Sequence, residues 1–296
     1  MNRTVAVLGP GAVGGSLAVR LSLAGVHTIC IGHTEAAGII ALAWLVVETK
    51  DGTLSARTEA AERLSRPVGV LLVTVKAPML EEAIARVDPS AVSEGVVVPL
   101  LNGLEHMETL RARFGGRVAA GSISHFQAYR AGRVQIIEAT SSPVITIASE
   151  SLSRGDLESA ADLLRTAGLD VRVGQNEKRV LWHKVARIAP LAAATAASGR
   201  TVGELRSDPT WRPRLDHAIA ETCSVAQADG VGLRASAQWA IIDEIADETT
   251  TSAARDVLAG RHSELDTIVG AVLRAAERLD VTCPALTELA AAAGLR

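Results

Sequence analysis

One lysine of this sequence stands in an apolar stretch, LWHKVARIAP at residues 181–190. The chain has 30 lysine and arginine residues, but only four are lysine, and Lys184 lies between Trp182 and Val185. Apolar neighbours remove water from an ammonium group and lower its pKa, which makes the group a usable proton donor near neutral pH. Reduction of a ketone needs such a donor, because negative charge develops on the carbonyl oxygen as hydride reaches the carbon. The alternative is a helix-surface lysine whose stem packs on the core.

A glycine-rich segment near the N-terminus, VAVLGPGAVGGSLAVRLSLAG, contains the pattern GxGxxG as Gly9, Gly11 and Gly14. The pattern follows an apolar run and opens a helical pattern, which is the context that predicts dinucleotide binding. Gly9 permits a tight turn, Gly11 lets the backbone approach a pyrophosphate, and Gly14 allows close packing of helix on strand. The N–H groups at the start of the helix would bind the phosphates. The predicted cofactor loop comprises Gly9, Pro10, Gly11, Ala12, Val13 and Gly14. The alternative is a glycine-rich turn without a ligand.

The residue that reads the adenosine ribose of a dinucleotide is expected after the second strand. An acidic residue there favours NAD, whereas a basic residue accepts the 2′-phosphate of NADP. His33 occupies this position, and Thr34 follows it. Both can donate hydrogen bonds and neither repels a phosphate, which favours NADPH. The alternatives are that His33 is a solvated loop residue and that Glu35 selects NAD.

Two polar residues follow neighbouring predicted strands. Lys76 comes at the end of VTVKAP, and Asn102 comes at the end of PLLNGLE. Ligands of open α/β sheets bind outside the carboxyl ends of the strands, so both residues would face the crevice beside the glycine loop. The alternatives are a surface lysine with a packed stem for Lys76 and turn chemistry in Asn-Gly for Asn102.

Near the C-terminus, the block TSAARDVLAGRHSELDTIVG carries several polar and charged residues. Its spacing predicts two helices separated at Gly260. Ser252 is expected to cap the first of these helices. Asp256 and Arg261 are expected to form a structural ion pair.

The elements that must position these residues change in character along the chain. Strands are predicted at residues 4–8, 27–31, 68–75, 95–101, 118–129, 133–139, 143–149 and 169–174. Helices are predicted at residues 12–25, 78–86, 104–113 and 153–167, and then at 177–198, 211–230, 236–247, 252–260, 262–280 and 284–293. The early alternation indicates an α/β domain with a parallel sheet, to which the strands between 118 and 149 add in antiparallel fashion. We therefore predict a Rossmann dinucleotide-binding domain at residues 1–174 and an all-α domain at residues 175–296.

Composition excludes several classes of function. A net charge of −3 without a basic block, and an aromatic content of 2 %, argue against a nucleic-acid partner. The three cysteines have neither metal-site nor disulfide spacing, which favours a reduced, cytoplasmic setting. Because MNRTVAVLG leads directly into a predicted strand, we expect no signal peptide. The longest apolar run, at residues 38–47, is too short to span a bilayer.

With these segments in place, the chain resembles the ketopantoate reductases (2-dehydropantoate 2-reductases) over essentially its whole length. The resemblance rests on GPGAVG, on TVKA, on LLNGLE, on GSISH at residues 121–125, on LWHKV, and on the block from Thr251 to Gly270. The spacing S–x3–D–x4–R–x2–E–x–D in that last block is more specific than the glycine loop. Members of the family reduce a 2-keto acid with NADPH, using a Rossmann domain and a helical second domain that often pairs in homodimers.

The resemblance implies a role for each matching residue. Lys184 matches the general acid, and Glu264 matches a residue near the nicotinamide ribose and the catalytic centre. Asn102 and Lys76 match residues that line the nicotinamide and substrate crevice. Ser252 matches a contact of the substrate carboxylate, and the His33 position often holds an arginine for the 2′-phosphate.

One departure concerns the substrate. The family continues after its lysine through asparagines that bind the polar end of the substrate, but no asparagine lies between Lys184 and Pro190. Ile188 and Ala189 cannot donate those hydrogen bonds, so either Arg187 or another residue compensates, or the substrate differs. Three hypotheses follow: reduction of ketopantoate, reduction of a different ketone by the same fold, and a non-catalytic NADP-binding protein.

Overall fold

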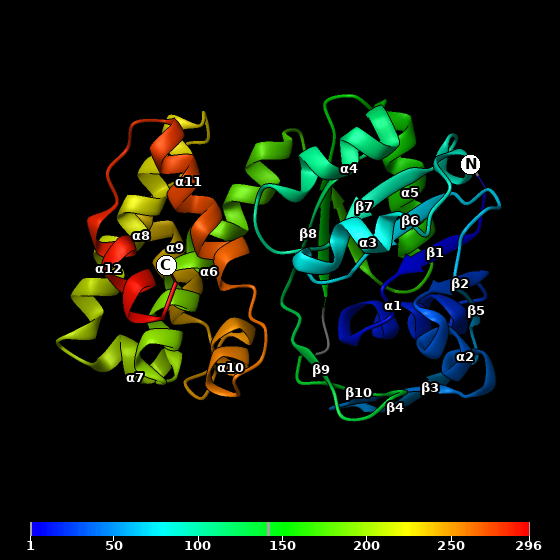
Figure 1. Cartoon of the computed structure of the whole chain (residues 1–296), viewed down its shortest axis with the longest axis horizontal. Coiled ribbons are helices and arrows are strands. Elements are labelled where there is room, and N and C mark those ends of the chain that lie inside the picture. The colour runs from blue at the N-terminus through cyan, green and yellow to red at the C-terminus, as the bar shows by residue number, and fades with distance from the viewer. Residues whose placement is uncertain (1, 141–142, 296) are drawn as a thin grey trace. The chain divides into compact units, whose positions relative to one another are not determined.

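A computed structural model of the chain describes residues 2–140 and 143–295. The fold divides into two compact units (Figure 1). The first unit contains residues 1–101 and 106–180, and the second contains residues 102–105 and 181–296. The short segment that follows the strand Val96–Pro99 therefore packs with the C-terminal helices and not with the sheet that precedes it.

The first unit is built on a five-stranded parallel sheet in the order β5-β2-β1-β6-β7. Its strands are β1 (Val5–Leu8), β2 (Thr28–Ile31), β5 (Glu59–Ala61), β6 (Val70–Val73) and β7 (Val96–Pro99). Four of them are wholly buried and, apart from Thr28 in β2, apolar, as expected of strands that are covered on both faces. Leu8 is in register with Ile31 and Val73, so the carboxyl ends of β1, β2 and β6 lie level at one edge. The segments after these strands therefore begin side by side.

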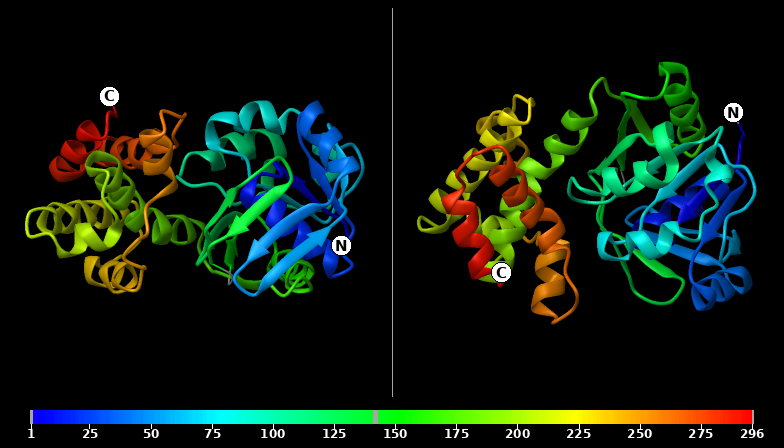
Figure 2. Two further views of the ribbon diagram at one scale, coloured as in Figure 1. Left: turned by 90° about the horizontal axis from the view of Figure 1, so that it is seen from below. Right: turned by 45° about the horizontal axis from the view of Figure 1, so that its top comes forward.

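Helix α1 (Ala12–Leu23) lies between this sheet and a second, four-stranded sheet of order β4-β3-β10-β9 (Figure 1). The second sheet consists of β3 (Leu45–Thr49), β4 (Gly52–Ala56), β9 (Ala128–Arg130) and β10 (Gln135–Glu138), and its strands run across the front of the unit in the left view of Figure 2. Burial on two sides explains why α1 is apolar around nearly its whole circumference.

The strands β8 (Ala120–Ser124), β11 (Val144–Ala148) and β12 (Asp170–Val173) form a third sheet. We predicted that the strands between 118 and 149 extend the parallel sheet in antiparallel fashion, and this was wrong. Instead, β8 pairs antiparallel with β11 in the third sheet, and β9 pairs antiparallel with β10 in the second sheet. Strand β12 joins β11 in parallel, and β10 also pairs in parallel with β3. A single bridge between Val97 and Val118 links β7 to the segment before β8.

The remaining helices of the first unit cover its sheets. They are α2 (Thr34–Leu42), α3 (Leu80–Ile84), α4 (His106–Phe114), α5 (Arg154–Arg165) and the short turns η1 (Ala77–Met79), η2 (Pro89–Val92) and η3 (Gly115–Arg117). Helix α2 and the β3–β4 hairpin were not predicted from the sequence. The apolar run at residues 38–47 divides between them, with its first part in α2 and its last part in β3.

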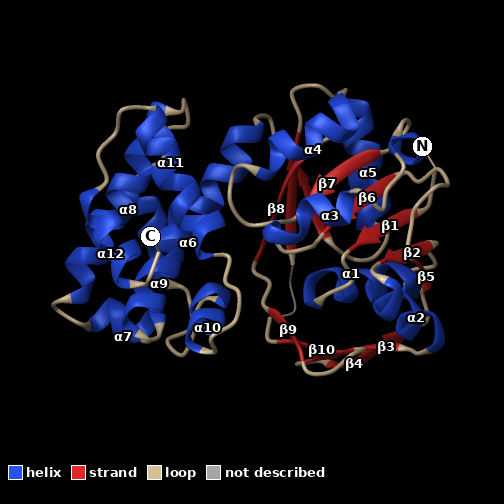
Figure 3. Cartoon of the chain, in the orientation of Figure 1, coloured by secondary structure: helices blue, strands red, loops and turns tan. Residues whose placement is uncertain are grey.

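In the described residues of the second unit, the regular secondary structure is all helical, and loops connect the helices (Figure 3). Its helices are α6 (Glu177–Ser198), whose first turn belongs to the first unit, α7 (Val202–Ser207), α8 (Trp211–Ala228), α9 (Ala235–Asp243), α10 (Ser252–Leu258), the π-helical turn η4 (Asp266–Gly270), α11 (Ala271–Arg278) and α12 (Pro284–Ala292). The bounds of α6 match the prediction, whereas α7 was missed. Small alanine side chains fill much of the core around α6, which lets the helices pack closely. The predicted fold class, a parallel α/β domain followed by an all-α domain, is confirmed.

None of the helices in the described residues is both long enough and apolar enough to cross a bilayer.

Candidate active site

The glycine loop after β1 has the geometry of a phosphate-binding turn. Gly9 adopts a φ of +85°, which side-chain-bearing residues rarely adopt, and its N–H donates to the Ile31 carbonyl at 2.9 Å. The Thr74 hydroxyl, at the end of β6, donates to the carbonyls of Gly9 at 2.8 Å and Leu8 at 3.1 Å. The loop is therefore held by both neighbouring strands, and Thr74 is a residue of the site that the sequence did not single out.

Gly14 and Gly11 differ in how closely other atoms surround them. A Cβ on Gly14 would lie 2.6 Å from the Gly9 carbonyl oxygen, so the helix can approach the loop only without a side chain there. A Cβ on Gly11 would meet, among the described residues, only that same oxygen at 3.9 Å and would otherwise point into open space. No side chain caps α1 within the described residues, because Gly11 is its N-cap. The first-turn N–H groups thus face an open cradle suited to a pyrophosphate.

A buried carboxylate of the second sheet holds α1 in place on the side away from the parallel sheet. Glu138 of β10 is 3 % exposed, accepts a hydrogen bond from the Ser16 hydroxyl, and pairs with the Arg20 guanidinium at 2.6 Å. Gly15 packs against Ile136 of the same strand. The helix that carries the phosphate cradle is therefore fixed to the second sheet by charge as well as by packing.

His33 lies after β2, at the carboxyl edge of the parallel sheet, where the residue that contacts the adenosine ribose is expected. It also caps a helix. Its Nδ1 accepts from the Ala36 N–H at 3.4 Å, so the imidazole is the N-cap of α2. This bond leaves Nε2 to carry the proton of the neutral ring. Two residues later, the Glu35 carboxylate pairs with the Arg133 guanidinium at 2.7 Å. Arg133 comes from the turn before β10, 98 residues away, and the sequence did not predict its presence at this edge.

Lys76 is exposed and precedes η1, three residues after β6 ends. The predicted strand at residues 68–75 is thus shorter than expected, and the lysine belongs to the loop beyond the carboxyl edge. Within the first unit, the structure brings the glycine loop, His33 and Lys76 to the same edge of the parallel sheet.

Asn102 belongs to the second unit, and a bidentate ion pair holds its segment there. Gly103 has a φ of +94° and lies against Thr267 of η4. Arg274 donates to both carboxylate oxygens of Glu105 at 2.8 Å and also to Asp266 at 2.9 Å. The half-buried Asn102 is therefore anchored to the turn that follows Glu264.

Lys184 is half-buried on α6, in the electrostatic field of two charged groups. Burial, and then repulsion by the Arg187 guanidinium, lower its pKa from 10.5 to about 8, while attraction to the Glu264 carboxylate acts in the opposite direction. Glu264 is itself 9 % exposed. Burial also lowers the pKa of Arg187, but a guanidinium is basic enough to stay charged at neutral pH. An ammonium with a pKa near 8 can donate a proton to a developing alkoxide at neutral pH.

Ser252 is exposed and is the first residue of α10. We expected it to be the N-cap, but the cap is Thr251, whose hydroxyl accepts from the Ala254 N–H at 3.1 Å. The serine hydroxyl is therefore not used as the cap. The predicted ion pair of Asp256 with Arg261 is confirmed at 2.9 Å.

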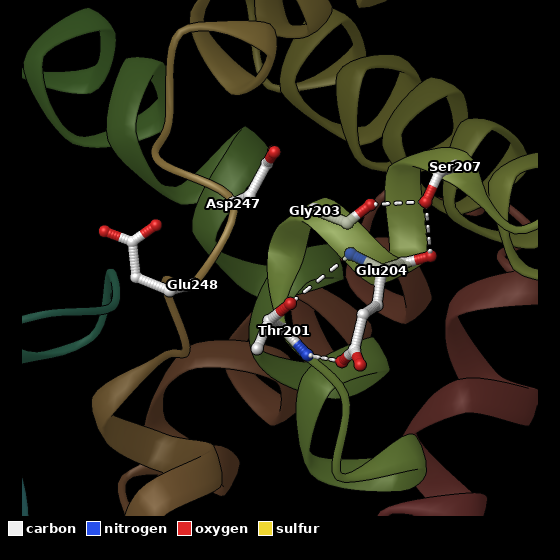
Figure 4. A pocket seen from close by; sticks show the side chains of 6 residues that line it. All are labelled: Thr201, Gly203, Glu204, Ser207, Asp247 and Glu248. Carbon is white, nitrogen blue, oxygen red and sulfur yellow. Dashed lines mark hydrogen bonds between the residues drawn. The ribbon is translucent and has the colours of Figure 1, made fainter.

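A shallow hollow on the second unit lies among α7 and the loop after α9 (Figure 4). Its lining consists of Thr201, Gly203, Glu204, Ser207, Asp247 and Glu248. Thr201 and Glu204 form a reciprocal capping box for α7, and Asp247 pairs with Arg206. The hollow contains none of the predicted site residues, and the polar side chains of Thr201, Glu204, Ser207 and Asp247 serve the fold. Across the described residues, no group of three or more His, Cys, Asp or Glu side chains could hold a metal ion.

Comparison with known proteins gives matches along most of the chain. Residues 5–149 match the family described as ketopantoate reductase PanE/ApbA, and residues 176–295 match the family described as ketopantoate reductase PanE/ApbA C terminal.

Individual relatives are distant but collinear with the chain. The uncharacterized oxidoreductase YkpB of Bacillus subtilis (strain 168) is 24 % identical over 287 residues, which cover 95 % of this chain and 94 % of that protein. A 2-dehydropantoate 2-reductase of Vibrio cholerae serotype O1 is 25 % identical over 291 residues, which cover 95 % and 93 %. Among solved structures, the ternary structure of D-mandelate dehydrogenase with NADH and anilino(oxo)acetate superposes with a TM-score of 0.88 at 20 % identity, covering 98 % of this chain and 97 % of that one. This last likeness shows the shared fold.

Proposed function

The chain belongs to the ketopantoate reductase family, and on that premise we propose that it reduces a small 2-keto acid to the 2-hydroxy acid with NADPH. The observation that carries the proposal is the half-buried Lys184, whose pKa is lowered to about 8. A protein that only bound a nucleotide would have no use for a proton donor of this kind.

The dinucleotide fits the cradle formed by Gly9, Gly11 and the start of α1, because the backbone there leaves open space in front of free N–H groups. Lys76, Asn102 and Glu264 are proposed to contact its nicotinamide half. When bound, the reduced nicotinamide supplies the hydride for the carbonyl carbon.

Lys184 completes the reduction from the side of the carbonyl oxygen. Its ammonium donates a hydrogen bond to that oxygen, stabilises the negative charge that develops there, and transfers one proton to give the hydroxyl group. Glu264 stabilises the charged form of the lysine and so keeps it protonated before the transfer. Ser252 is proposed to bind the substrate carboxylate through its exposed hydroxyl. The amine regains its proton from solvent.

The preference for NADPH rests on the edge near His33. The Glu35 carboxylate, which would repel a 2′-phosphate, is neutralised by Arg133 at 2.7 Å. His33 Nε2 and the start of α2 add donors. The structurally similar D-mandelate dehydrogenase was solved with NADH, so NADH is the competing cofactor.

Two substrates are candidates. Relatives named 2-dehydropantoate 2-reductase support ketopantoate. The absence of asparagine between Lys184 and Pro190, together with a structural neighbour that holds anilino(oxo)acetate, supports a 2-keto acid with an apolar side chain. The three free, buried cysteines support a cytoplasmic location, where thiols stay reduced.

The test is oxidation of NADPH and NADH by the purified protein with a panel of 2-keto acids, followed by Lys184→Ala. We expect NADPH turnover with at least one keto acid, and loss of turnover with retained NADPH binding in the variant. Absence of turnover with every keto acid and both cofactors would instead leave a non-catalytic NADP-binding protein as the better hypothesis.

A further inference from the structure

We propose that Arg187 binds the substrate carboxylate in addition to the Ser252 hydroxyl, and that Ile188 receives the substrate side chain, so that the enzyme acts on 2-keto acids with an apolar group beside the carbonyl. This inference rests on the proposed function and specifies the substrate class of the same site. It assigns roles to two residues at the point where the chain departs from its family.

The first step is the geometry of α6. Residues three and four positions apart lie on one face of a helix, so Arg187 and Ile188 are the two nearest neighbours of Lys184 toward the C-terminus. Helical side chains lean toward the N-terminus, which brings the Arg187 guanidinium back beside Lys184. Its Nη1 donates to the His183 carbonyl at 3.0 Å, one turn earlier, in agreement with this direction.

The cluster formed by Lys184, Arg187 and Glu264 carries a net positive charge. Two cations, Lys184 and Arg187, are partly buried close enough to repel each other, and the opposing charge that acts on the lysine comes from Glu264. Among the described residues, no carboxylate forms an ion pair with Arg187, and its hydrogen bond to the His183 carbonyl uses one of five N–H donors. A desolvated guanidinium with free donors is suited to a planar carboxylate, which it can hold through two parallel hydrogen bonds. Lys184, Arg187 and Glu264 together carry one net positive charge, which the single negative charge of a monocarboxylate would balance.

The residues that follow the two cations on α6 are apolar. Ile188 is partly buried and packs against the core of the second unit, and Ala189 beyond it is fully buried. Neither side chain can hydrogen-bond a hydroxyl group. A 2-keto acid whose carbonyl oxygen meets Lys184 and whose carboxylate meets Arg187 therefore directs its third substituent toward an apolar contact.

The carboxylate role is tested with a pair of ligands of nearly the same shape, one anionic and one neutral. Anilino(oxo)acetate is an unreactive 2-oxo acid, and its primary amide is the neutral match. In Arg187→Gln, saturated with NADPH, we expect calorimetry to show about 100-fold weaker binding of the acid and less than a threefold change for the amide. Arg187→Lys should restore part of the affinity, and Arg179→Gln, at an exposed arginine of the same helix, should leave both affinities unchanged. Equal weakening of acid and amide, or no binding of the acid by the unmodified protein, would overturn the role.

The apolar role is tested with a pair of substrates that differ by one hydroxyl. These are 4-hydroxy-3,3-dimethyl-2-oxobutanoate (ketopantoate) and 3,3-dimethyl-2-oxobutanoate. We expect the unmodified enzyme to favour the second compound by about 10- to 100-fold in kcat/KM, and Ile188→Asn to reduce or reverse that preference. A preference of the unmodified enzyme for ketopantoate would refute the apolar role while upholding the proposed reductase function, whereas no turnover with either compound or any other keto acid refutes the reductase itself.

Discussion

The lowered pKa of Lys184 predicts how the reaction depends on pH. Because the protonated amine is the donor, kcat/KM for keto-acid reduction should be constant up to the pKa of about 8 and then fall tenfold for each further pH unit. Oxidation of the 2-hydroxy acid needs the neutral amine, so kcat/KM in that direction should rise with pH through the same midpoint. The assay is the absorbance of NADPH at saturating cofactor, from pH 6 to pH 10.

Variants of this lysine separate its titration from that of other groups. In Lys184→Arg the cation cannot lose its proton in this range, so the limb near pH 8 should disappear while a lower activity remains. Lys184→Met should lose about 10²- to 10⁴-fold in kcat, the usual contribution of a general acid. If the limb near pH 8 persists in Lys184→Arg, the titrating group is a different residue and the reasoning from burial is wrong.

The same shift predicts an effect on stability whose sign follows from proton linkage. The unfolded chain keeps this proton up to pH 10.5 and the folded chain only up to about 8, so between these values the unfolded state binds more protons and stability rises with pH. Below pH 8 the full penalty of burying the ammonium is present, about 3 kcal/mol from the size of the shift. Lys184→Met should therefore raise the free energy of unfolding at pH 7 by up to that amount, whereas Lys50→Met, at an exposed lysine of the first unit, should change it little.

Substitutions that remove one partner of an ion pair are expected to change cofactor binding, stability or turnover. Arg133→Ala exposes Glu35 to the 2′-phosphate and should raise the KM for NADPH about tenfold while leaving the KM for NADH nearly unchanged, as steady-state kinetics with both cofactors will show. Glu138→Ala leaves a half-buried guanidinium without its partner and should lower the free energy of unfolding by about 3 kcal/mol in urea titrations, an effect that a neutral surface substitution would not produce. Arg274→Met releases Glu105 and should lower kcat more than cofactor affinity, because the segment of Asn102 loses its anchor; an unchanged kcat would show that Gly103 packing alone holds the segment.

Features that depend on neighbouring residues could be predicted from the sequence. The glycine turn is determined by contacts within a few residues and by the end of an adjacent strand, and the structure has it as expected. The helix Glu177–Ser198 was predicted with both ends, because its length and alanine content leave few alternatives. We predicted Ser252 as the N-cap of α10, and the structure has Thr251 there. The error is one position, because serine and threonine both cap helices well.

Features that depend on distant partners could not be predicted. The pairing of β10 with β3 joins segments about 90 residues apart, and nothing in the sequence of β10 distinguishes one sheet edge from another. The hairpin of β3 and β4 could not be predicted, because the apolar run that contains the start of β3 begins in helix α2 and gives no sign of a boundary. Arg133 reaches Glu35 only because the second sheet covers α1 and brings the turn before β10 to that edge.

The energetics of α6 bear on whether this chain is an enzyme. A partly buried ammonium costs stability at neutral pH, and a second desolvated cation three residues later adds repulsion to that cost. A fold selected only to bind a nucleotide would be more stable with apolar side chains at Lys184 and Arg187, since the core beside them is already filled by alanine and isoleucine. Residues that lower stability in this way are typical of sites where charge is needed for chemistry. The two cations therefore favour catalysis on an anionic substrate over a purely structural or binding role, and the binding of a keto acid should raise the free energy of unfolding by relieving their repulsion.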